Sequence, residues 1–225
     1  MTTLIRIDLP TCDYDSALRL QRRLVARVAA DDTAAYLILT EHDPPVITLG
    51  RRGSSSDILA SPQQLADSGT EVRRSGRGGL ATWHGPGQLV AYPVLRLDRG
   101  RRSVHGHVRN LEEAVLQTLA RFDLAGRRRD GEAGVWAGDA KIASVGVAVQ
   151  RWVSFHGVAL NVCNDLSAFE MIVPCGRPGG AVTSMTEMLG REVSVEDVAD
   201  SFAEAFADIC GFDEGPTLAD GEMDA

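Results

Sequence analysis

Several short segments of the chain have the hydrophobic pattern of β-strands. Some alternate between apolar and polar residues, and others are apolar runs rich in strand-forming side chains. These segments cover residues 4–9, 35–39, 46–49, 89–97, 134–137, 140–150 and 152–162. We expect a strand at each, and we expect 35–39 and 46–49 to form a pair across Asp43-Pro44-Pro45.

Three longer segments have the spacing of amphipathic helices, with apolar residues that recur every three or four positions. They cover residues 14–31, 103–122 and 195–210. Asp13 and Ser194 are suitable N-caps for the first and the last of them. Shorter helical segments are expected at residues 62–66, 166–169 and 182–189.

Strands therefore interleave with helices, and no internal repeat is present. This arrangement predicts an α/β or α+β fold, with one domain that covers residues 1–210. The final segment, residues 211–225, contains five acidic residues and no basic one. Such a composition predicts a disordered acidic tail.

The overall composition is that of an ordinary globular protein. Of 225 residues, 44% are hydrophobic and 24% are charged, and the net charge is −8. This charge disfavours general nucleic-acid binding and attachment to a membrane surface. No run of about 18 apolar residues predicts a transmembrane helix, and the N-terminus lacks the pattern of a signal peptide. We expect a cytoplasmic protein with no membrane partner and no nucleic-acid partner.

The cysteines and histidines do not have the spacing of metal ligands. The four cysteines, Cys12, Cys163, Cys175 and Cys210, form no CxxC pair, and the five histidines are dispersed. Zinc sites and redox dithiols usually show closely spaced ligands. We expect free thiols in a reducing compartment and no bound metal.

Lys141 is the only lysine of the chain. Lysine and arginine together number 23, so the other 22 are arginines. Arginine stays protonated in proteins, whereas a lysine can lose its proton. A single lysine among so many arginines suggests a position that needs an amine able to titrate. A coding bias towards arginine, with one lysine left by chance, explains the composition equally well.

The alternation around Lys141 places it in line with four apolar residues, Ala143, Val145, Val147 and Val149. If the alternation holds, the amine points to the apolar side of the strand, where partial burial would lower its pKa. A β-bulge before Lys141 would instead turn the side chain outward.

A glycine-rich segment precedes the strand at 89–97. Five glycines lie between Gly76 and Gly87, flanked by arginines and a histidine. Glycines let backbone amides approach a ligand closely, although the segment lacks the Gly-Lys-Ser/Thr ending of a phosphate-binding P-loop. A turn-rich hairpin with solvated arginines is the alternative interpretation, and Arg127-Arg128-Arg129 is expected to be a solvated basic turn.

Five motifs of this chain, in the same order, resemble those of the lipoyl(octanoyl) transferases. They are Thr48-Leu49-Gly50-Arg51, Arg77-Gly78-Gly79 with Thr82-Trp83-His84-Gly85-Pro86-Gly87-Gln88, residues 138–146 around Lys141, His156-Gly157-Val158-Ala159-Leu160-Asn161, and Val173-Pro174-Cys175-Gly176. The resemblance extends from the first strand to Met188. His107 departs from the family, in which a tyrosine is common at this position.

The resemblance implies the biotin/lipoate protein ligase fold, one α/β domain with a mixed sheet flanked by helices. It also implies that Cys175 carries an octanoyl thioester and that Lys141 tunes this cysteine. The acyl pocket would be lined by Arg77, Gly78, Gly79, Leu80, Ala81, Thr82, Trp83, His84, Ser144, Val145, Gly146, Gly157, Val158 and Ala159.

The implied function is octanoyl transfer, the first step of protein lipoylation. The donor would be octanoyl-acyl carrier protein. The acceptors would be the apo lipoyl domains of 2-oxoacid dehydrogenase complexes and the glycine cleavage H protein, each through a specific lysine. Because thioester exchange is nearly isoenergetic and amide formation is downhill, no ATP or other cofactor is expected.

Other interpretations remain open at this point. The chain could be an ATP-dependent lipoate or biotin ligase, an amidotransferase between lipoyl-domain proteins, or a binding module without chemistry. Buried cysteines are usually inert, as we expect for Cys12, Cys163 and Cys210, and His84 and His156 are most simply structural histidines. The arginines at 51–52, 73–74, 77 and 127–129 either form solvated faces or dock the acidic carrier.

Overall fold

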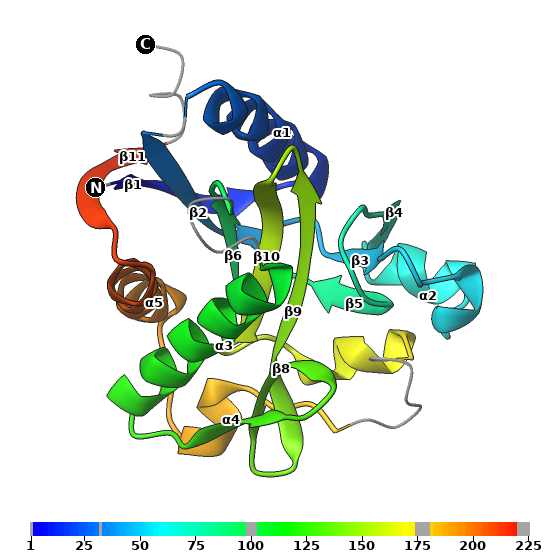
Figure 1. The fold of residues 1–225 in the computed structure, drawn as a ribbon. Helices are drawn as coiled ribbons and strands as arrows, with labels where there is room; N and C mark the ends of the chain where they lie inside the picture. Colours follow the sequence, from blue (N-terminus) through cyan, green and yellow to red (C-terminus); the bar gives the residue numbers. More distant parts are fainter. Residues whose placement is uncertain (1, 32, 98–102, 174–180, 220–225) are drawn as a thin grey trace.

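A computed structural model describes residues 2–31, 33–97, 103–173 and 181–219 (Figure 1). The helices are α1 (Tyr14–Ala30), α2 (Pro62–Asp67), α3 (Val104–Arg121), α4 (Met185–Leu189) and α5 (Val195–Cys210), with 3₁₀ turns η1 (Ser55–Asp57) and η2 (Leu166–Met171). The strands are β1 (Thr3–Cys12), β2 (Ala34–His42), β3 (Val46–Leu49), β4 (Glu71–Arg74), β5 (Ala81–His84), β6 (Gln88–Val94), β7 (Gly126–Arg129), β8 (Glu132–Ala137), β9 (Ala140–Gln150), β10 (Val153–Asn161) and β11 (Asp213–Ala219).

Eight strands form one mixed sheet in the order β11-β1-β2-β6-β10-β9-β8-β7. β1 is parallel to β2 and to β11, and the helix α1 provides the crossover that the parallel pair of β1 and β2 needs. The remaining neighbours are antiparallel. β3, β4 and β5 form a separate small sheet in the order β4-β3-β5.

Helices cover both faces of the large sheet, and the alternation of β2 decides which residues meet them. Leu37 and Leu39 point into a core shared with α3 and α5, whereas Tyr36 and Ile38 point into a core shared with α1. Successive side chains of a strand lie on opposite faces, so a strand buried on both faces needs apolar residues at every position. Figure 1 shows α3 crossing in front of β9 and β10, with α5 beside it.

The small sheet has its own core. Its apolar face packs on η2 and on the residue that follows it, through Ile47, Leu49, Ala81, Trp83, Phe169 and Ile172. Figure 1 shows this sheet beside the central strands of the large one. The gap between the two sheets is where the candidate site lies.

The three longer helices and the short helix at 62–66 are confirmed, including the caps, whereas 166–169 lies in the 3₁₀ turn η2 and 182–189 is helical only over Met185–Leu189. The Asp13 carboxylate accepts a hydrogen bond from the amide of Ser16 at 2.8 Å, and the Ser194 hydroxyl accepts from Glu196 and Asp197. These caps satisfy amides that a helix leaves unpaired at its first turn.

Two predictions and one alternative interpretation are wrong. Residues 35–39 and 46–49 do not pair with each other, because β2 joins the large sheet and β3 joins the small one. The glycine-rich segment is not the turn of a hairpin, because the strands that bound it, β4 and β5, pair with β3 on its two sides and not with each other. Arg127-Arg128-Arg129 belongs to β7, whose arginines pair with acidic side chains, and is not a solvated turn.

The prediction of a disordered tail from residue 211 is also wrong. Residues 213–219 form β11, which pairs in parallel with β1 at the edge of the large sheet (Figure 1). Gly215 lies so close to β1 that a Cβ there would be 2.6 Å from the carbonyl oxygen of Leu4. Residues 220–225 lie outside the described residues.

Within the described ranges, no helix is both long enough and apolar enough to cross a membrane.

Candidate active site

A cavity of about 190 Å³ lies between the small sheet and strands β6, β9 and β10 of the large sheet. Twelve of the fourteen residues that the sequence suggested for an acyl pocket line it. They are Arg77, Gly79, Leu80, Ala81, Thr82, His84, Ser144, Val145, Gly146, Gly157, Val158 and Ala159. Lys141 lines the same cavity.

Two residues suggested for the pocket do not line this cavity. Gly78 lies behind the lining, where its amide donates to the carbonyl oxygen of Val147 at 2.9 Å. Trp83 faces the other side of β5 and packs edge-on against Phe169, with ring centroids 5.8 Å apart. Side chains alternate along β5, so Thr82 and His84 take the cavity side and Trp83 cannot.

Sequence reasoning did not assign several residues that line the cavity. They are Tyr14, Thr48, Arg52, Val90, Tyr92, Gly131, Glu132, Ala133 and His156. Thr48 and His156 belong to motifs that were recognised, so the motifs themselves pointed to them. Tyr14 and the turn at Gly131 come from elements far away in the sequence, and only the fold brings them here.

Glycines allow the glycine-rich segment and strand β9 to approach each other closely at the edge of the cavity. A Cβ at Gly146 would lie 3.0 Å from the carbonyl oxygen of Gly78 and 3.1 Å from Cδ of Arg77. A Cβ at Gly50 would lie 2.5 Å from the carbonyl oxygen of Gly79. The glycine-rich segment therefore lies directly against β9, and glycine is required for that close approach.

Arg77 is buried and organises one side of the cavity. Its Nε donates to the hydroxyl of Thr48 at 3.0 Å, and Nη2 donates to the same hydroxyl at 2.8 Å and to the carbonyl oxygen of Thr48 at 2.6 Å. Nη1 donates to the carbonyl oxygen of Gly78 at 3.0 Å. These bonds hold the guanidinium in the wall, so Arg77 is not available as a surface charge.

His84 is buried and neutral. Burial, reinforced by His42 and Arg77, holds its pKa well below 6.5. Its Nδ1 lies 2.8 Å from Oε1 of Gln88, and its Nε2 lies 3.4 Å from the hydroxyl of Thr48. Since an amide oxygen only accepts, Nδ1 carries the proton and Nε2 accepts from Thr48.

His156 is the most unusual residue of the lining. It has a left-handed φ of +58°, it is buried, and burial together with Arg77 and two other arginines lowers its pKa to about 3. Its amide donates to Oε1 of Gln21 at 2.8 Å. Its Nε2 has no hydrogen-bond partner among the described residues. The cavity thus contains a neutral polar atom beside apolar surface.

Lys141 lies on the cavity side of β9 because of a β-bulge. β8 pairs Val135 with Ala143 and Trp136 with Lys141, so Ile142 is an extra residue on β9. Ile142 and Ala143 both point into the core under α3. The predicted alignment of Lys141 with Ala143 is therefore wrong, and the bulge turns the half-buried lysine towards the cavity instead.

The amine of Lys141 is held by neighbouring groups of β8. Its Nζ donates to the carbonyl oxygen of Ala133 at 2.9 Å and lies 4.9 Å from the centroid of the Trp136 ring. An ammonium over an indole ring is attracted by the electrons of the ring. Because these contacts come from a paired strand, the position of the amine is fixed by the sheet.

Cys175, the predicted nucleophile, lies outside the described residues. The chain before it is described as far as Val173, whose amide donates to the carbonyl oxygen of Asp57 at 2.8 Å. It is described again from Ala181, whose carbonyl oxygen accepts from the amide of Lys141 at 2.9 Å. The described chain that follows the cysteine segment therefore begins beside Lys141.

The other three cysteines do not line the cavity. Cys163 is exposed rather than in the core as expected, while Cys12 and Cys210 are half-buried. Partial desolvation, together with the nearby carboxylates of Glu41 and Glu192, raises the pKa of Cys163, and burial raises that of Cys210 to about 12. A thiol with a raised pKa is a poor nucleophile at neutral pH.

Comparison with known proteins identifies the family of this chain. Residues 13–207 match the family model described as the lipoyl protein ligase A/B catalytic domain. An octanoyltransferase of Geotalea uraniireducens is 44% identical over 219 residues, which cover 97% of each chain. The chain belongs to the octanoyltransferase family. The resemblance that the five motifs suggested is thereby confirmed, and a second octanoyltransferase, from Geobacter metallireducens, is 44% identical over 88% of this chain and 90% of its own.

Solved structures confirm the predicted fold class. A lipoate-protein ligase A bound with ATP has a TM-score of 0.76 at 20% identity, covering 97% of this chain and 90% of its own. The putative lipoate protein ligase Ta0514 from T. acidophilum with bound lipoic acid has a TM-score of 0.73 at 19% identity, covering 98% and 90%. At these identities the likeness shows that the fold is shared.

Proposed function

We propose that this octanoyltransferase moves an octanoyl group from octanoyl-acyl carrier protein to a lysine of apo lipoyl domains, through a thioester on Cys175. The observation that carries the proposal is the position of Lys141. The only lysine of the chain lines the cavity and is joined through its backbone to the segment that follows Cys175. The proposed acceptors are the lipoyl domains of 2-oxoacid dehydrogenase complexes and the glycine cleavage H protein, and the proposed place of action is the cytoplasm.

The first step forms the acyl-enzyme. The Cys175 thiolate attacks the thioester carbonyl of the donor, a new S–C bond forms, and the bond to the carrier sulfur breaks. The departing thiolate takes a proton from the Lys141 ammonium. An ammonium about 4 Å from a thiolate would contribute roughly 4 kcal/mol at an effective dielectric constant near 20, which stabilises the nucleophile at neutral pH.

The second step forms the amide. The amine of the acceptor lysine attacks the enzyme thioester, the N–C bond forms, and the Cys175 sulfur leaves. The acceptor amine must lose a proton, and the neutral Lys141 left by the first step receives it. Both steps together return the enzyme to its starting state. We propose that they consume no ATP and need no other cofactor.

The acyl chain is proposed to lie along β9 and β10. Ser144 and Ala159, which line the cavity on these two strands, have small side chains that leave room for it. Each methylene removed from water contributes about 0.8 kcal/mol. A cavity closed by Tyr92 and His156 would therefore give an optimum of chain length, since further methylenes find no space.

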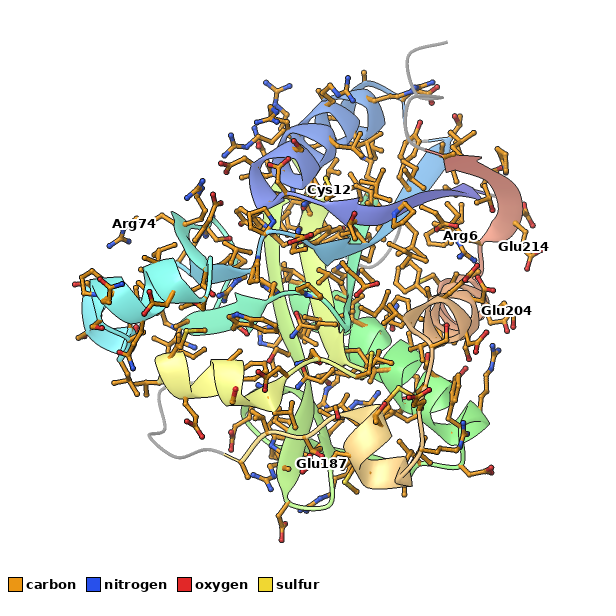
Figure 2. The ribbon with its side chains drawn as sticks, turned by 180° about the vertical axis from the view of Figure 1, so that it is seen from behind. Arg6, Cys12, Arg74, Glu187, Glu204 and Glu214 are labelled. Atoms are coloured by element: carbon orange, nitrogen blue, oxygen red, sulfur yellow. The ribbon has the colours of Figure 1, made fainter. Side chains whose placement is uncertain are left out.

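The proposed docking site for the acidic carrier consists of Arg51, Arg52 and Arg74. All three are exposed, Arg52 also lines the cavity, and Figure 2 shows Arg74 projecting away from the ribbon. Other arginines first considered are neutralised by the protein itself, such as Arg73, which pairs with Asp15 at 3.0 Å and with Glu71 at 2.9 Å.

Charge reversal tests the docking site. Replacing Arg51 and Arg52 by glutamate is expected to raise KM for octanoyl-acyl carrier protein about tenfold and to leave kcat within twofold, because rim charges mainly affect encounter. Arg127→Glu is the matched control, since Arg127 already pairs with Asp139 at 2.7 Å. An unchanged KM in the double variant would exclude this surface.

The rival function is an ATP-dependent lipoate ligase, because the fold is shared with a ligase that binds ATP. The test is an assay with octanoyl-acyl carrier protein and an apo lipoyl domain, with and without ATP. Octanoylation of the acceptor lysine without ATP, abolished by Cys175→Ala, supports the transferase. Transfer that needs ATP and survives Cys175→Ala supports the ligase. Transfer from one octanoylated lipoyl domain to another, with none from the carrier protein, would indicate an amidotransferase.

A further inference from the structure

A continuous series of side-chain hydrogen bonds crosses the protein behind the cavity and ends at the segment that follows Cys175. From His84 it passes to Gln88, whose Nε2 donates to Oδ1 of Asn161 at 2.9 Å. Nδ2 of Asn161 then donates to the carbonyl oxygen of Thr183 at 3.0 Å. The series joins strands β5, β6 and β10 to the residues that precede α4.

We propose that Asn161 is a positioning residue, which sets the backbone of Lys141 by holding Thr183. The inference rests on the proposed function, because it assigns a role to Asn161 in that reaction. Asn161 does not line the cavity, so its role in the reaction would be indirect.

The direction of each bond in the series is fixed. A carbonyl oxygen only accepts, so the atom of Asn161 next to Thr183 is the amide nitrogen, and its oxygen faces Gln88. Gln88 must then present its own nitrogen to Asn161, which the second contact from Nε2 to the carbonyl oxygen of Trp83 at 3.3 Å supports. Its oxygen is left for His84. The series therefore has one arrangement, which gives it the rigidity that a positioning role requires.

Thr183 is held from three sides. Its amide donates to the carbonyl oxygen of Lys141 at 3.0 Å, its carbonyl oxygen accepts from Asn161, and its hydroxyl donates to Glu187 of α4 at 2.6 Å. Val182 forms a parallel bridge with Lys141. The main chain of Lys141 is therefore held by Thr183 and Val182 on one side, as it is by β8 on the other.

Burial makes the contribution of Asn161 large. Gln88 and Asn161 are 1% and 4% exposed. Removing the amide of Asn161 leaves the carbonyl oxygen of Thr183 without its donor and weakens the hold on Gln88, and buried polar groups that lose their partners cannot turn to water. We expect the short segment around Thr183 to shift when this donor is removed.

The single lysine provides a direct measurement. In protein grown with ¹³C-labelled lysine, Lys141 gives the only lysine side-chain signal in an NMR spectrum, and no substrate is needed. Asn161→Leu keeps the approximate shape and removes both hydrogen bonds. Asn110→Leu is the matched control. The half-buried side chain of Asn110 lies on α3, and its amide donates to Sγ of Cys210 at 3.9 Å.

Asn161→Leu is expected to move the Cε signal of Lys141 and to lower kcat for octanoyl transfer by about 10- to 100-fold, as misplacement of a reacting group does. KM for the octanoyl donor should stay within twofold, and Asn110→Leu should change none of these. An unchanged Lys141 signal with unchanged kcat in folded Asn161→Leu would overturn the proposal. If Asn161→Leu does not fold, Gln88→Met should move the signal in the same direction, and an unmoved signal overturns the proposal equally. Because the signal is read without substrate, a wild-type protein that transfers no octanoyl group would refute the proposed function separately.

Discussion

Gly134 leaves the space that the side chain of Lys141 occupies. A Cβ at Gly134 would lie 2.5 Å from Cε of Lys141 and 3.1 Å from its Nζ. The same Cβ would lie 2.5 Å from the carbonyl oxygen of Ala143, and Gly134 has a φ of +132°. Glycine at this position is therefore a condition for the observed placement of the amine.

Gly134→Ala is expected to displace Lys141 and to lower kcat for octanoyl transfer by about 100-fold or more. Thermal unfolding should show a loss of stability as well. Gly138→Ala is the control, because Gly138, in the turn that follows β8, also has a positive φ, +55°, but its Cβ would meet nothing within 4 Å. Equal losses of kcat in the two variants would show that backbone strain, and not the position of Lys141, explains the effect.

Lys141→Arg separates charge from proton transfer. Arginine keeps the positive charge but does not give up its proton, so it cannot accept a proton from the acceptor amine. We expect kcat to fall by about 10²-fold or more, in the range of lost acid–base catalysis, while circular dichroism shows an intact fold. Activity of Lys141→Arg within a few-fold of the wild type would contradict the role of Lys141 as a base.

His107 should make the protein less stable in acid. Burial lowers its pKa to about 4, whereas in the unfolded chain the pKa is about 6.5. Between these values the unfolded state binds more protons, so the free energy of unfolding falls as pH drops below 6.5 and is unaffected by His107 above it. At pH 5 the loss is about 2 kcal/mol, from 1.36 kcal/mol per pH unit.

His107→Phe is therefore expected to reduce the difference in unfolding free energy between pH 8 and pH 5 by about 2 kcal/mol. Nε2 of His107 has no hydrogen-bond partner in the described part of the chain, so phenylalanine removes no bond from it. His105→Gln, at an exposed position on the same helix, should leave the difference unchanged. The measurement is urea unfolding at both pH values, and a difference equal to that of the wild type would reject this account of His107.

Removal of β11 is expected to expose the edge of β1. A chain that ends at Phe212 loses the parallel partner of β1, and an unpaired edge strand favours self-association. Size-exclusion chromatography should show larger species, and thermal unfolding should begin at a lower temperature. A chain that ends at Ala219 retains β11 and should behave like the full chain. If both truncated chains behave alike, β11 does not protect the sheet.

The helices could be predicted from the sequence because their signals are local. Asp13 and Ser194 cap the helices that follow them, and the apolar stripe of each helix is visible within one segment. The pairing of strands is not a local property, so 35–39 and 46–49, separated by a short turn, were wrongly expected to pair. β11 was missed for the same reason, since its acidic sequence is compatible with a strand only when β1 lies beside it.

The motifs predicted which residues form the site, but they did not predict its geometry. Lys141 was recognised by composition, but the bulge at Ile142 decides on which side of β9 its side chain lies. No residue type in β9 predicts that bulge. The role of Gly134 depends on β8 and β9 being neighbours. Tyr14 reaches the cavity only because α1 packs on the same face of the sheet. Motifs indicate which residues matter, whereas strand register decides where they point.

The central claim is that Cys175 carries the octanoyl group, and intact-protein mass spectrometry tests it most directly. The protein is mixed with octanoyl-acyl carrier protein in the absence of ATP and of any acceptor. We predict an added octanoyl mass that hydroxylamine removes, that maps to the peptide containing Cys175, and that is absent in Cys175→Ala. An adduct that appears only when ATP is added, or that persists in Cys175→Ala, would contradict the claim.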